Sequence, residues 1–303
     1  MSSVVRTLAS LVELLVLPVV VTGVINRVKA LWAGRRGPPI LQLAYDLRRL
    51  LRKQPVYSTV TTPVFRLAPY VVLATTLVSA LIVPLLGARG VLSFAFDFVW
   101  FAYVFGLGRV ALVLGALDTG SAFEGMGASR EATYAALLEP VLFLVVGALC
   151  LASDESTLAG ALELRPLGGA TLFVWLGSVV ALFVVVQVES ARLPVDDPST
   201  HLELTMIHEV MILDHSGPEL AALQASAAMK LTLGLSILAA LVNPWPGSPA
   251  AHVAACLLLA VLVGTIESII ARFKMSAIPQ FILAGLVAAA VALLATSWRG
   301  AGG

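Results

Sequence analysis

Charged residues are scarce in this sequence. They make up 12% of the 303 residues, whereas 59% are hydrophobic and the mean hydropathy is +0.97. A soluble protein carries roughly 25% charged residues. A chain with so few charges cannot cover a water-facing surface, which excludes an ordinary soluble domain. The composition also gives no basis for nucleic-acid binding, and we expect the lipid bilayer to be the main surroundings of the chain.

Cysteine is scarcer still. The two cysteines, Cys150 and Cys256, both lie inside apolar runs and form no CxxC pair. An iron–sulfur cluster usually needs four thiolates. His208 and Glu209 begin a zinc-protease signature, but Ile212 stands where its second histidine is required. We therefore expect no metal and no cofactor in this chain, so that any electron transfer must occur on a partner.

Long apolar runs are what the sequence has in abundance. A membrane-spanning helix needs about 20 mainly apolar residues. The runs predict an all-α polytopic membrane protein, a single transmembrane domain over residues 1–303 that contains a bundle of about eight spanning helices. The expected spans are 4–25, 67–86, 94–117, 133–152, 168–188, 221–242, 251–271 and 277–297.

The basic residues are distributed unevenly between the loops. The loops that follow the first, third, fifth and seventh expected spans hold thirteen of the 19 lysines and arginines, and the opposite loops with both tails hold four. Loops rich in lysine and arginine stay in the cytoplasm. We therefore expect a multi-pass protein of the inner (cytoplasmic) membrane, with loops 26–66 and 189–220 in the cytoplasm and both termini on the other side.

The first long loop has an amphipathic segment of its own. Its apolar residues recur at helical spacing on the face opposite Asp46, Arg49 and Lys53, and they are Ile40, Leu43, Leu47, Leu50 and Leu51. Such a pattern is typical of a helix that lies at the membrane surface.

Several ionisable residues fall inside the apolar runs or at their edges, where each costs roughly 2.5–3.5 kcal/mol to insert. They are Glu13, Asp97, Arg109, Glu139, Glu189, Lys230 and Glu267. Buried carboxylates of this kind suit a proton relay, but each has a structural alternative. Glu13 could face a partner subunit, Glu139 could be a solvated helix start, and Glu267 could pair with Arg272 at the end of its span. Asp97 and Arg109 are twelve residues apart, roughly 18 Å along a helix, so Arg109 is expected to pair with a neighbouring helix instead.

The loop after the fifth span is the segment richest in ionisable groups. We expect an ion pair between Arg192 and Asp196, and a helix from about residue 200 that carries His201, His208 and His215 near one face. Carboxylates and imidazoles in a row suit proton exchange, because histidine titrates near pH 6.5. Ordinary solvation of a cytoplasmic loop remains the alternative.

Three motifs resemble the family of complex I subunit 1, and within it the hydrogenase branch with the membrane subunits of formate hydrogenlyase and hydrogenase-4. They are GRRGP at 34–38 with Gln42 and Asp46, GSAFEGMGASRE at 120–131 with Glu139, and the segment 189–218 that contains THLELTMIHEVMILDHSGP. The resemblance covers nearly the whole chain.

The resemblance implies an eight-helix bundle that docks an electron-transferring arm and begins a proton path. The proton-path and coupling residues that we expect are Arg130, Glu139, Glu189, Arg192, Asp196, Glu203, His208 and Glu209. The docking loop is expected to use Arg35, Arg36, Gly37, Pro38 and Asp46.

The implied function is that of a non-catalytic, anchoring and ion-translocating subunit of an oxidoreductase complex. Its expected partners are the large and small hydrogenase subunits, which would carry the nickel–iron centre and the iron–sulfur clusters, and antiporter-like membrane subunits. The alternative is a quinone-chamber subunit of an NADH–quinone oxidoreductase-type complex. Ser199, His201 and Ile25 stand where the quinone branch has glutamates, which favours the hydrogenase branch. A stand-alone transporter and a passive scaffold are the other possibilities, although no inverted repeat supports the transporter.

Overall fold

The computed structural model describes residues 3–87, 89–166, 168–196 and 206–301, and within them the chain is helical and contains no strand. The α-helices are α1 (Ser3–Trp32), α2 (Gln42–Leu50), α3 (Pro63–Ala80), α4 (Asp97–Asp118), α5 (Ala122–Ser153), α6 (Leu158–Ala161), α7 (Ala170–Glu189), α8 (Gly217–Val242), α9 (Pro249–Ile269) and α10 (Ile278–Ala301). Short 3₁₀ turns occur at η1 (Leu85–Gly87), η2 (Glu209–Ile212) and η3 (Met275–Ala277).

Eight of these helices are long and apolar enough to cross a membrane, which confirms the predicted fold class. The fourth is longer than the sequence suggested, because α5 begins at Ala122 and not near residue 133. Local signals set several helix starts. Pro63 and Pro249 lie in the first turns of α3 and α9, and the side chains of Thr62 and Ser248 cap the same two helices.

α8 is the central helix of the bundle. Within its most apolar window 72% of the residues are buried, against 28–44% in the other seven spanning helices. It packs against α1, α3, α7 and α9. Small residues let other helices approach each other closely. At Gly177 of α7, a Cβ would lie only 2.7 Å from the carbonyl oxygen of Ala288 in α10.

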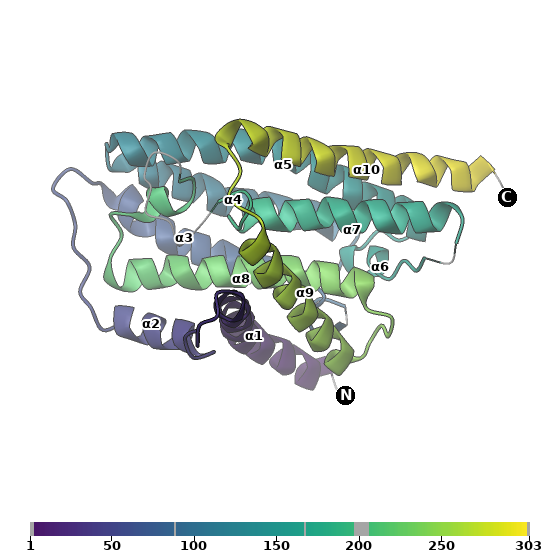
Figure 1. Cartoon of the computed structure of the whole chain (residues 1–303), viewed down its shortest axis with the longest axis horizontal. Helices are drawn as coiled ribbons and strands as arrows, with labels where there is room; N and C mark the ends of the chain where they lie inside the picture. The colour runs from purple at the N-terminus through teal and green to yellow at the C-terminus, as the bar shows by residue number, and fades with distance from the viewer. Residues whose placement is uncertain (1–2, 88, 167, 197–205, 302–303) are drawn as a thin grey trace.

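The helices α3, α4, α5, α7, α8 and α10 follow the long axis of the molecule, and α1 and α9 cross it obliquely (Figure 1). The connections form two groups. At the long-loop end, which holds the segments after α1 and after α7, the amide of Val56 donates to the Oγ of Ser216 over 2.9 Å. At the short-loop end, which holds the α3–α4, α5–α7 and α8–α9 connections, the amide of Phe96 donates to the carbonyl of Ser156 over 2.7 Å.

The amphipathic segment of the first long loop forms α2, as its spacing predicts. Leu50 is buried, and α2 packs against α1 and α8. Gly23 of α1 lies so close to the backbone of Ile40 that a Cβ would collide with it. The loop is thus packed onto the bundle on both sides of α2.

Candidate functional site: a buried charge cluster at the long-loop end

Arg109 of α4 lies at the centre of a cluster of carboxylates. Its Nη1 is 3.0 Å from Glu139 Oε1, its Nε is 3.5 Å from Glu131 Oε1, and its Nη2 pairs with Glu189. The arginine side chain is only 10% exposed. A guanidinium has five N–H donors in a planar fork and can serve several carboxylates at once. The prediction that Arg109 pairs with carboxylates of neighbouring helices is confirmed.

Four spanning helices contribute to this cluster. Glu131 and Glu139 are eight residues apart on α5, so they share one face of that helix. Glu189 is the last residue of α7, and Lys230 of α8 places its Nζ 3.9 Å from Glu189 Oε1. Three carboxylates therefore face two cations. Uptake of one proton makes the cluster neutral, which matters because an unbalanced charge is costly in apolar surroundings.

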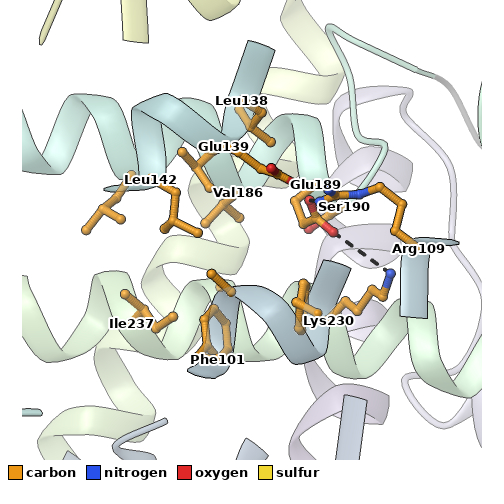
Figure 2. Close-up of a pocket in the computed structure, with 15 residues that line it drawn as sticks. Phe101, Arg109, Leu138, Glu139, Leu142, Val186, Glu189, Ser190, Lys230 and Ile237 are labelled. Carbon is orange, nitrogen blue, oxygen red and sulfur yellow. Dashed lines mark hydrogen bonds and ion pairs between the residues drawn. The ribbon is translucent and has the colours of Figure 1, made fainter. Parts of the chain in front are cut away.

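A pocket extends from the cluster into the bundle. Figure 2 shows Arg109, Glu139, Glu189 and Lys230 together at one end of it, whereas Phe101, Leu142 and Ile237 line the other end. The cavity volume is about 60 Å³. A water molecule needs roughly 10–15 Å³ of such volume, so the pocket has room for a few waters beside the charged groups.

Glu139 also faces outward. Its side chain is 53% exposed, in a groove of about 530 Å³ between α4 and α5. Tyr103, Leu107 and Val110 line the same groove. The charge cluster therefore reaches the lateral surface of the bundle through one residue, while Glu189 stays 14% exposed inside it.

The described residues of the loop after α7 lie beside the cluster, since η2 packs against α4 and α5. Asp196 Oδ2 accepts hydrogen bonds from the amides of Ile207 and His208 over 3.0 and 3.1 Å, and Asp196 Oδ1 is 2.8 Å from Arg272 Nη2. Burial lowers the pKa of His208, and the nearby charge of Lys230 lowers it further. Burial raises the pKa of the Glu209 carboxyl. Because η2 packs against α4 and α5, the helices that carry Arg109 and Glu139, the loop and the cluster are neighbours.

A second ionic group lies next to the same loop. Glu267 of α9 has a fully buried side chain, and its Oε2 is 3.0 Å from Lys29 Nζ of α1. Its Oε1 is 3.4 Å from Arg192 Nη1. The structure describes both Arg192 and Asp196, and the predicted ion pair between them is wrong. Glu267 and Arg272, distant in sequence, supply the partners instead.

Comparison with known proteins identifies the family of the chain and solved structures with the same fold. The sequence model of NADH dehydrogenase matches residues 5–297. The chain belongs to the NADH dehydrogenase family. This is the family of complex I subunit 1, as the motifs of the sequence indicated.

Two relatives in the family belong to hydrogenases. The chain is 31% identical over 287 residues to hydrogenase-4 component C of Escherichia coli (strain K12), covering 93% of this chain and 88% of the relative. It is 28% identical over 252 residues to formate hydrogenlyase subunit 4 of the same organism, covering 82% and 80%. The chain is thus a multi-pass membrane subunit of the kind found in complex I-related hydrogenase and oxidoreductase complexes.

A solved structure has the same fold. A chain of the membrane-bound sulfane sulfur reductase, an archaeal respiratory membrane complex, superposes with a TM-score of 0.75 over 97% of this chain and 100% of its own length. The sequence identity is 20%, so this likeness concerns the fold alone.

The other expected site residues lie in the loop after α1, in α2 and beside the loop after α7. Arg130 donates to the carbonyl of Met206 over 2.9 Å and so contacts the loop after α7. Arg35, Arg36 and Pro38 are exposed beyond the end of α1, and Gly37 is half-buried. Asp46 pairs with Arg49 at 2.9 Å on α2. Glu203 lies outside the described residues.

The helix predicted from about residue 200 is wrong for residues 206–216. These residues contain only the 3₁₀ turn η2, and α8 begins at Gly217. His208 and His215 therefore do not share a helical face. His215 is buried, stacks on Phe65 with ring centroids 4.0 Å apart, and has its Nδ1 3.4 Å from Glu219 Oε2.

The sequence reasoning missed Glu131 and did not assign Arg109 or Lys230 to the path. A signal for Glu131 was present, because it lies eight residues before Glu139 and thus on the same face of a continuous helix. The expected start of that span near residue 133 left it outside the membrane.

Proposed function

We propose that this chain is the membrane-anchoring and proton-path subunit of a membrane-bound nickel–iron hydrogenase of the formate hydrogenlyase or hydrogenase-4 type. The observation that carries the proposal is the charge cluster of Arg109, Glu131, Glu139, Glu189 and Lys230, which joins the loop after α7 to a pocket inside the bundle. The names of the two hydrogenase relatives favour this complex.

In this proposal the long-loop end docks the electron-transferring arm. The large and small hydrogenase subunits would bring the nickel–iron centre and the iron–sulfur clusters. This chain cannot supply a cluster's four thiolates, since its two cysteines lie on different helices, α5 and α9. The basic residues of the long loops favour a cytoplasmic location for that end, with both termini on the far side of the inner membrane.

The proposed mechanism is a coupling of charge to protonation. A change of charge or conformation in the docked arm acts on Asp196, His208 and Glu209. These residues pass the change to Lys230 and Glu189, and the cluster gains or loses its one balancing proton. The outward face of Glu139 suits a path that continues into a neighbouring antiporter-like subunit.

Replacing Glu189 with glutamine tests this path. Glutamine keeps the size and one acceptor oxygen but cannot take up or release a proton, so ion movement per hydrogen evolved in sealed vesicles is expected to fall at least about tenfold. Glu139→Gln is expected to do the same, and Glu155→Gln, an exposed position at the short-loop end, serves as the matched control. Recovery of nickel with the tagged chain in mild detergent checks assembly. Normal ion movement in both cluster variants would contradict the proposed path.

A quinone-chamber subunit is the second candidate. The pocket below Arg109 is about 60 Å³ and is smaller than the roughly 300–1,000 Å³ of sites for organic ligands. The groove of about 530 Å³ between α4 and α5, which Arg109 and Glu139 line, lies within that range and is the observation that favours this candidate. Quinone reductase activity without nickel in the recovered complex would favour this second candidate over the first.

A further inference from the structure

A second group of polar side chains is buried at the short-loop end, where α1, α8, α9 and η1 pack together. It consists of Glu13, Ser236, His252 and Cys256. Glu13 is 8% exposed, and the other three are fully buried. On α1, the opposite face carries exposed apolar residues such as Val12 and Leu15, so Glu13 is turned into the bundle.

The four side chains form a polar series across α1, α8 and α9. His252 Nε2 is 2.8 Å from Ser236 Oγ, which is also 3.4 Å from the carbonyl oxygen of Pro84. The thiol of Cys256 is 4.0 Å from the carbonyl oxygen of Leu235, the residue before Ser236, and it lies one helical turn after His252 on α9. The series therefore brings together Glu13 of α1, Ser236 of α8, and Cys256 and His252 of α9, where these three helices pack against one another.

No cation balances this carboxyl group in the described part of the chain. Neither oxygen of Glu13 makes a hydrogen bond or an ion pair there, although the backbone of Leu86 faces it. His252 Nδ1 likewise has no partner among the described residues. An isolated carboxylate in apolar surroundings is so costly that the group is stable with its proton bound.

The series also approaches the aqueous phase. A cavity of about 20 Å³ is lined by Pro84, Asn243 and the exposed residue Glu163. This volume exceeds the roughly 10–15 Å³ that one water requires. Pro84 belongs to both the cavity and the polar series, since its carbonyl oxygen accepts from Ser236.

We propose that the buried Glu13 and the Ser236–His252 pair form a second proton-binding site that opens to the water at the short-loop end. The site would extend the proposed ion path, and this role rests on the proposed function. Proton binding at the site does not depend on that function. Its ligand is a proton and not sodium, because an imidazole and a thiol are poor ligands for a hard cation.

A hydrophobic carbodiimide tests the site in the whole complex, because this reagent modifies protonated carboxyl groups in apolar surroundings. Glu267 is the internal control, since it is equally buried on α9 but paired with two cations. We expect mass spectrometry to find the adduct at Glu13 and not at Glu267. Once Glu13 titrates, the labelled fraction should fall about tenfold for each further pH unit.

Sealed vesicles give the direction of access. The pH of the two sides is set independently. Labelling of Glu13 is expected to respond to the pH on the side of the Asn243–Ser248 loop, and to respond more slowly in His252→Gln. An infrared band of a protonated carboxylic acid that disappears in Glu13→Gln checks the same site without the reagent.

Three results would overturn the proposal. They are the absence of both the adduct and the infrared band, protection of Glu13 by sodium at constant pH, and labelling that follows the opposite side. Failure of the proposed function is distinguishable from these, because it appears as normal ion movement in Glu189→Gln while Glu13 is still labelled.

Discussion

The two ends of the bundle bury ionisable groups in opposite ways. At the long-loop end, Arg109 and Lys230 meet three carboxylates beside a pocket with room for water. At the short-loop end, Glu13 meets only neutral groups among the described residues. The first arrangement holds charge by pairing it, whereas the second is stable only without charge. Replacing an ionisable residue with an apolar one should therefore change stability in opposite directions at the two ends.

The strongest test of this contrast is Arg109→Met. It leaves Glu131, Glu139 and Glu189 without their shared partner, and breaking such a buried group by removing one member costs ~3–5 kcal/mol. We expect a large fall in the thermal stability of the chain in detergent-solubilised membranes. Arg109→Lys keeps the charge but loses the planar guanidinium that reaches three carboxylates. Its thermal stability should therefore lie between those of Arg109→Met and the parent chain. Equal stability of Arg109→Met and the parent chain would show that the cluster is not held by pairing.

A smaller loss is expected for Glu267→Gln. The change leaves Lys29 and Arg192 without their common carboxylate, and groups left in this way cost ~1–3 kcal/mol. Lys29 is 27% exposed and can turn toward water, which limits the effect. The thermal transition of the same membranes measures it. A loss larger than that of Arg109→Met would reverse the ranking of the two ionic groups.

Glu13→Leu should have the opposite sign. Leucine has a similar volume and removes two polar oxygens that have no partner in the described structure. Replacing an unsatisfied buried polar group with an apolar one of the same shape is neutral or stabilising, by up to ~1 kcal/mol. A clear destabilisation would mean that the Glu13 carboxyl is paired after all, and the contrast between the two ends would then fail.

The sequence could predict the fold because membrane helices depend on a local property. About 20 apolar residues are needed for each span, and the eight runs correspond to the eight spanning helices. The pairing of Arg109 was predictable for a similar reason, because a lone cation in lipid requires a carboxylate. Its distance from Asp97 along one helix excluded the partner on its own span.

The rest depended on contacts between distant segments. Arg192 pairs with Glu267 and Asp196 with Arg272, neither of which local spacing can reveal. The helical periodicity of residues 206–216 was overridden by the amides of Ile207 and His208, which donate to Asp196. The burial of Glu13 likewise depends on the packing of α1 against α9, which local sequence does not reveal. Its carboxyl was a candidate from the sequence, but His252 lies so far along the chain that nothing indicated their association.

The smallest expected effect on stability concerns His215. This residue combines features of the two ends, because it is buried like Glu13 but lies beside a carboxylate, as Arg109 does. Burial lowers its pKa below the ordinary 6.5, against the opposing influence of Glu219 and Asp214. A histidine that stays neutral in the folded state favours folding above pH 6.5, and this contribution is lost as the pH falls from 6.5 through the folded pKa. Because Glu219 also accepts a hydrogen bond from Tyr57 over 2.6 Å, the loop before α3 should loosen first. We expect limited proteolysis near Tyr57 to accelerate below pH 6.5, and less so in His215→Gln. Equal acceleration in both proteins would assign the pH dependence to another group, such as His208, whose pKa is lowered in the same direction.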